Sequence, residues 1–168
     1  MINRLFLEMI QFYKNDPARI QHFVKVHAFA RLMGQEEKLD GETLKTLEAA
    51  ALVHDIGIKP AEEKYGSCGG KLQEQEGPAA AREMLERLGV EPGRIERVCY
   101  LVGHHHTYTE IQGMDYQILV EADFLVNLYE DHLDKKSVLS VLKKIFKTES
   151  GKKICREMFG VKEEEQGE

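Results

Sequence analysis

The chain has 168 residues, a formal net charge of −6, and 42% hydrophobic and 31% charged residues. This length predicts a single domain, 1–168, with a sizeable buried core. Because the net charge is negative, we expect no binding to nucleic-acid polymers through their phosphates, whereas a small anionic substrate is compatible with it if a metal ion supplies positive charge.

Membrane and disulfide signals are absent from the sequence. No apolar run is long enough to span a membrane, and the first six residues are too quickly charged for a signal peptide. Cys68, Cys99 and Cys155 are widely spaced and odd in number, which favours neither a disulfide framework nor a zinc ribbon. We therefore expect a cytoplasmic protein without membrane contact, either a monomer or a homodimer.

Apolar residues recur with helical spacing along most of the chain, and three prolines follow plausible turn or cap positions. The pattern predicts an all-α bundle of about seven or eight helices. The expected helices cover approximately 2–14, 17–34, 41–57, 78–89, 92–104, 115–133, 135–147 and 150–159. Segment 58–77 is glycine-rich and polar, so we expect a loop there that acts as a lid. Residues 161–168 form an acidic tail.

The second expected helix carries a histidine on its apolar face. His22 shares a stripe with Val26 and Met33, so its imidazole is expected to be buried. A buried histidine serves either as a core residue bonded to a carbonyl group or as a metal ligand. His27 fits the stripe less well and is the second candidate for the same role.

The third expected helix ends in the dipeptide His54-Asp55, directly after the apolar run 49–53. Burying both side chains there costs several kcal/mol unless they are paired, and one divalent metal would satisfy both. The pair is therefore either a structural hydrogen bond at a helix end or half of a metal site.

Three consecutive histidines, His104, His105 and His106, follow the apolar stripe that includes Ile95 and Val102. Side chains of consecutive helical residues point about 100° apart, so all three cannot bind one metal from a regular helix. The stripe favours His105 or His106 as the buried residue. His104 reaches the same pocket if the helix ends there, so the choice stays open.

Asp123 lies in a nearly unbroken apolar helix, between Leu119 and Val126. A carboxylate at a buried position needs a partner, and a cation is the simplest one. The alternative is a hydrogen bond to the backbone or to Arg19.

In this order on successive helices, His22, His54, Asp55 and Asp123 resemble the H…HD…D signature of the HD-domain metal-dependent phosphohydrolases. The resemblance covers approximately 17–130, the core of the domain, and is closest in pattern to bacterial HD enzymes that hydrolyse nucleotides and dinucleoside polyphosphates. It implies an HD-domain-like helical bundle. The implied activity is hydrolysis of a small phosphoester or nucleotide by water that a metal ion activates.

The resemblance also implies a divalent, binuclear metal site. His22, His54 and Asp123 would hold one ion, and Asp55 would bridge, because a carboxylate offers two oxygens. The second ion would be held by residues at the family's further ligand positions, which here are Glu76, in place of the usual histidine, and His104 with His105. Iron or manganese suits this mixed set best, and cobalt, nickel, zinc or magnesium is compatible with it.

The catalytic residues implied by the resemblance are His54, Asp55 and Lys59. A lysine often stands three residues after the aspartate in the family; Ile58 occupies that position here and Lys59 follows it. Lys59, Lys64 and Lys71 in segment 58–77 are candidates for binding substrate phosphate. Two other functions use a similar ligand set: a di-iron oxygenase of the same fold, and a catalytically silent module that binds a metal or another ligand.

Overall fold

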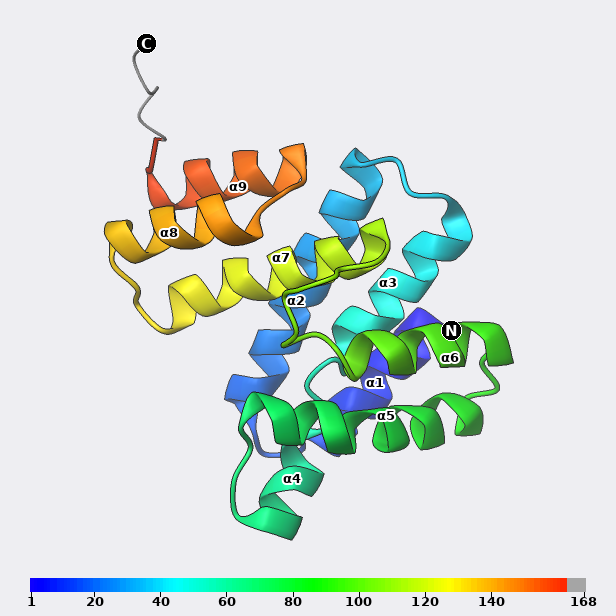
Figure 1. Ribbon diagram of the computed structural model, residues 1–168. Helices are drawn as coiled ribbons and strands as arrows, with labels where there is room; N and C mark the ends of the chain where they lie inside the picture. Colours follow the sequence, from blue (N-terminus) through cyan, green and yellow to red (C-terminus); the bar gives the residue numbers. More distant parts are fainter. Residues whose placement is uncertain (163–168) are drawn as a thin grey trace.

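Figure 1 shows the protein as a computed structural model, which describes residues 1–162. Residues 163–168 of the predicted acidic tail lie outside the described part. Residues 1–162 form nine helices and no strand, which confirms the predicted all-α class. The helices are α1 (Ile2–Phe12), α2 (Pro17–Glu36), α3 (Gly41–Val53), α4 (Ile58–Tyr65), α5 (Gly70–Arg87), α6 (Pro92–Val102), α7 (Met114–Glu130), α8 (Lys135–Ile145) and α9 (Glu149–Phe159).

Carboxylate side chains cap the N-terminal ends of several helices. Asp16 accepts a hydrogen bond from the amide of Arg19 at the start of α2, and Glu91 accepts from two amides at the start of α6. Pro17 and Pro92 occupy the first turns of these two helices, where a missing N–H group costs nothing. Local chemistry therefore defines the starts of the two helices that lead into the site.

Helix α3 lies at the centre of the bundle and contacts α1, α2, α6 and α7. Residues 46–53 of α3 are all buried. In Figure 1, α2, α3 and α7 meet near the centre, α8 and α9 lie along α7, and α4 and α5 lie at the opposite end. The C-terminal end of α3, with His54 and Asp55 in the turn that follows it, is thus held at the middle of the fold.

The prediction of a loop over 58–77 is wrong. This segment forms α4 and the first part of α5, joined by a short connection that begins at Gly66, whose φ of 67° is left-handed. Pro78, which we expected near a helix start, lies inside α5. The glycines and the proline indicated a break, but most of the segment is helical, so residues 58–77 contain no long loop that could act as a lid.

Two glycines in this region allow close packing of backbones. A Cβ atom on Gly57 would lie 2.4 Å from the carbonyl oxygen of Gln73, and one on Gly77 would lie 2.6 Å from a methyl group of Val102. Helix α5 therefore packs directly against the turn that holds His54 and Asp55. Among the described residues, no helix combines the length and the apolar character needed to cross a membrane.

Candidate metal centre

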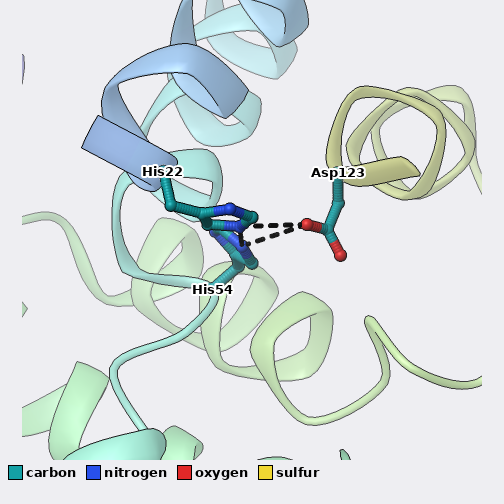
Figure 2. A group of neighbouring side chains, drawn as sticks. All are labelled: His22, His54 and Asp123. Atoms are coloured by element: carbon teal, nitrogen blue, oxygen red, sulfur yellow. Dashed lines mark hydrogen bonds and ion pairs between the residues drawn. The ribbon is translucent and has the colours of Figure 1, made fainter. Parts of the chain in front are cut away.

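Three buried side chains from different parts of the chain meet at the end of α3. Figure 2 shows His22 from α2, His54 after α3, and Asp123 from α7 pointing toward one another. Nε2 of His22 lies 3.3 Å from Nε2 of His54 and 3.2 Å from Oδ1 of Asp123. Nε2 of His54 lies 3.6 Å from the same oxygen. The atoms that would bind a metal therefore face a common point.

The carboxylate of Asp55 lies between this group and a second one. Oδ2 of Asp55 is 3.4 Å from Nε2 of both His22 and His54, whereas Oδ1 is 3.4 Å from Nε2 of His105. Asp55, His105 and His106 form a second group whose potential ligand atoms all lie within 4.8 Å of one another. Each carboxylate oxygen of Asp55 thus faces a different set of imidazoles.

Backbone carbonyl groups fix the orientation of two of these imidazoles. Nδ1 of His54 donates to the carbonyl oxygen of Ala51 at 2.9 Å, and Nδ1 of His105 donates to that of Val102 at 2.8 Å. Because a carbonyl group only accepts, the proton of a neutral ring is on Nδ1 and the lone pair is on Nε2. Both lone pairs point into the site.

A carboxylate orients the third imidazole. Nδ1 of His22 lies 2.8 Å from Oε2 of Glu130, and Oε1 of Glu130 lies 2.6 Å from Nζ of Lys25. The charged pair holds the ring of His22 with Nε2 toward His54 and Asp123. Carboxylate support of this kind is common behind histidines that bind metals.

The donor set fits a cation. In the neutral rings, the Nε2 lone pairs of His22 and His54 face each other at 3.3 Å, which is repulsive unless a proton or a metal ion lies between them. Nε2 of His105 is buried and has no hydrogen-bond partner among residues 1–162. A buried acceptor without a partner is costly. Imidazole nitrogens with carboxylate oxygens suit divalent manganese, iron, cobalt, nickel and zinc.

The ionisation of the carboxylates also favours a cation. Burial would raise the pKa of Asp55, but His54 and His105 outweigh burial and hold this pKa well below its ordinary value. The pKa of Asp123 is likewise lowered: burial opposes ionisation, and hydrogen bonds from His22 and His54 overcome it. Burial would lower the pKa of His54, but the two carboxylates raise it well above its ordinary value. The two ionised carboxylates thus stabilise positive charge on the imidazoles beside them, which is the charge that a divalent cation would supply at this point.

Two predicted ligands lie elsewhere and belong to neither group of converging atoms in the described chain. The carboxylate of Glu76 accepts hydrogen bonds from Lys64 and Tyr65, at 3.1 and 2.8 Å. His104 donates from Nδ1 to the carbonyl oxygen of Tyr100, and its ring stacks on that tyrosine. Of the residues predicted for the second ion, the structure brings His105 to the site but neither Glu76 nor His104, and it adds His106.

Lys59 also points away from the converging atoms. The side chain is exposed, and its Nζ lies 3.4 Å from the carbonyl oxygen of Phe12. The same Nζ lies 5.2 Å from the centre of the Phe12 ring. The second candidate of α2, His27, lies 3.0 Å from Glu48 and takes no part in the centre.

The centre opens into a cavity of about 300 Å³. Residues that line it include Arg19, His22, Asp55, His106, Asp123 and Glu130. The sequence patterns singled out neither Glu130 nor Asn127, whose side-chain amide donates to Oδ1 of Asp123 at 2.9 Å. Asn127 and Glu130 stand four and seven residues after Asp123 and therefore share its helical face. This spacing was the signal in the sequence that could have identified them.

The HD domain family model matches residues 19–165. The chain belongs to the HD domain family. This HD domain is similar in structure to a crystal structure described as a predicted HD superfamily hydrolase from an uncultured Thermotogales bacterium. The TM-score is 0.68 and the identity 24%, over 94% of this chain and 84% of that one. At this identity the likeness shows the fold alone.

A curated relative shares a shorter stretch with this HD domain. It is the bifunctional uridylyltransferase/uridylyl-removing enzyme of Phenylobacterium zucineum (strain HLK1), 44% identical over 61 residues. The match covers 36% of this chain and 6% of that protein. The HD domain therefore corresponds to a small part of the length of this relative.

Proposed function

We propose that this HD domain is a metal-dependent phosphohydrolase that acts on a small phosphoester or nucleotide. The observation that carries the proposal is the arrangement around Asp55, whose two oxygens face His22 and His54 on one side and His105 on the other. Such a set of nitrogen and oxygen donors matches the ligands of metal-dependent hydrolases.

We propose two positions for divalent ions, one in each group of converging atoms. His22, His54, Asp55 and Asp123 would hold one ion, and Asp55, His105 and His106 would hold a second. Bound ions would polarise a phosphoryl oxygen and lower the pKa of a water molecule. We propose iron or manganese as the resident ion, because the donors are mixed imidazole and carboxylate groups.

Arg19 is the residue we propose for substrate phosphate, in the role that the resemblance implied for Lys59. Its guanidinium group lines the cavity, and it pairs with Asp16 at 3.3 Å and with Glu62 at 2.5 Å. A planar guanidinium group binds phosphate oxygens through two parallel hydrogen bonds. Asp16 and Glu62 hold this group at the cavity, so a phosphoryl group bound beside Asp55 would meet a cation already in place.

The size of the cavity and one comparison support the proposed substrate class. About 300 Å³ is at the small end of ligand sites and suits a phosphorylated small molecule. The relative from Phenylobacterium is named for removing uridylyl groups, which is chemistry at a nucleotide phosphate, and this supports nucleotides as the first substrates to test.

A panel of substrates tests the proposal. The protein is loaded with manganese, iron, cobalt or zinc and assayed for phosphate or nucleotide release from nucleotides, dinucleoside polyphosphates and bis-p-nitrophenyl phosphate. We expect hydrolysis of at least one of them that EDTA stops and added metal restores. Oxygen consumption by the iron form without hydrolysis would favour the oxygenase instead. A metal-loaded protein that does neither would be a binding module.

A further inference from the structure

A second and larger cavity, of about 720 Å³, shares no lining residue with the cavity at the candidate metal centre. Four cationic side chains from four helices line it: Arg4 of α1, Arg31 of α2, Lys45 of α3 and Arg94 of α6. Among the described residues, the only carboxylate in its lining is that of Glu48. In a chain of net charge −6, this is a local concentration of positive charge.

Two of the cations are available to a ligand. Arg4 makes no ion pair within the part of the chain that the structure describes. Arg31 has only a loose contact, 3.7 Å from its Nε to Glu48, and its side chain is 57% exposed. Both guanidinium groups can therefore turn to an anion in the cavity without losing a close partner.

The other two cations share one exposed acidic side chain outside the lining. Glu42 contacts Nζ of Lys45 at 2.8 Å and also pairs with Arg94, although its own side chain is 72% exposed. Nε of Arg94 is buried and has no hydrogen-bond partner among the described residues. One carboxylate thus serves two cations, and positive charge remains in excess there.

His27 and the aromatic ring of Phe6 also line this cavity. Nε2 of His27 lies 3.0 Å from the carboxylate of Glu48, so this carboxylate already has a partner in the lining. The half-buried ring of Phe6 meets the ring of His27 edge-on, with the two centres 5.7 Å apart. A ligand in this cavity would meet cations and an aromatic surface together.

We infer that this cavity binds a small phosphorylated molecule with an aromatic part, of the nucleotide class. Guanidinium groups from several helices match the oxygens of a compact polyanion, and the volume lies within the range of small-molecule sites. The inference does not depend on the proposed hydrolase function, since the residues are different and no metal is involved.

Isothermal titration calorimetry with ATP tests the inference, on the full chain in EDTA so that no metal ion is bound. The wild-type protein should bind one ATP saturably, and affinity should fall as salt rises. The double variant Arg31→Ala/Lys45→Ala should bind at least about tenfold more weakly, because it removes two of the four cations that line the cavity. The charge-preserving variant Arg31→Lys/Lys45→Arg should recover part of this loss, because it keeps both charges although Arg31 loses its planar guanidinium group.

Two controls make the result specific. Lys143→Ala/Lys144→Ala removes two exposed charges from α8 and should not change the affinity for ATP. Asp55→Asn alters the candidate metal centre and should also leave ATP binding in EDTA intact. Circular dichroism checks that every variant is folded. The inference is overturned if wild type binds no ATP, if Arg31→Ala/Lys45→Ala binds as well as Lys143→Ala/Lys144→Ala, or if Asp55→Asn abolishes binding.

Discussion

Oδ1 of Asp55 lies 3.4 Å from Nε2 of His105, a buried nitrogen that makes no hydrogen bond within residues 1–162. The other oxygen of the same carboxylate faces His22 and His54. This one side chain therefore connects the two groups of potential ligands and is central to the site.

The first prediction concerns Asp55. Asp55→Asn keeps the size of the side chain but removes the charge that both groups share. We expect phosphoester hydrolysis to fall at least about a hundredfold and metal affinity to fall with it. Steady-state kinetics and metal titration measure the two effects. Asp131→Asn, at an exposed position after α7, is the matched control and should behave as wild type. Full activity in Asp55→Asn would remove Asp55 from the mechanism.

The second prediction concerns Glu130, which contacts Nδ1 of His22 and so orients the ring without belonging to the converging ligand atoms. Glu130→Ala should weaken metal binding by about 10–100-fold. Glu130→Gln still accepts the hydrogen bond from Nδ1 and should recover part of that loss. The measurement is the dissociation constant for manganese, together with activity at saturating metal, which should return toward wild type. Equal metal affinity in all three proteins would show that the contact is only structural.

The third prediction compares the contributions of Arg19 and Lys59 to substrate binding. Arg19→Ala should raise KM for a phosphorylated substrate about tenfold or more, because a charge-assisted hydrogen bond is lost. Lys59→Ala should leave KM within about twofold, since Nζ of Lys59 points to the carbonyl oxygen of Phe12. Initial-rate kinetics on one substrate compare the two. A larger effect from Lys59→Ala than from Arg19→Ala would restore the role that the resemblance implied for Lys59.

The fourth prediction concerns the packing of α5 against the turn after α3. Gly57→Ala would put a methyl group 2.4 Å from the carbonyl oxygen of Gln73, so the two backbones would have to separate. We expect a loss of about 1–3 kcal/mol in the free energy of unfolding. Gly69→Ala is the control, because its added methyl group meets no atom within 4 Å. Urea denaturation measures both, and equal stability of the two variants would contradict the packing described.

Much of the centre could be predicted from the sequence because its residues interrupt apolar helical stripes. His22 and Asp123 are polar residues at buried helical positions, and His54-Asp55 ends an apolar run. Helical spacing indicates that each lies on the buried side of its own segment, and the packing of α2, α3 and α7 brings the four side chains together. Whether they bind a metal is a question that spacing does not answer.

The remaining site residues could not be predicted, because they depend on how irregular segments fold. Helix α6 ends at Val102, so the directions of His104, His105 and His106 follow a turn and not a regular helix. Glu76 stands at a ligand position of the family, but it lies inside α5, where its carboxylate contacts Lys64 and Tyr65. Contacts between separate helices therefore determine both the directions of these histidines and the surroundings of Glu76.

The metal content of the purified protein, measured by inductively coupled plasma mass spectrometry, tests the central claim most directly. We predict at least one divalent transition-metal ion per wild-type chain after dialysis, and loss of that ion in the folded variant His54→Ala. A wild-type protein that retains no metal ion, even after incubation with manganese or iron, would contradict the proposed metal centre.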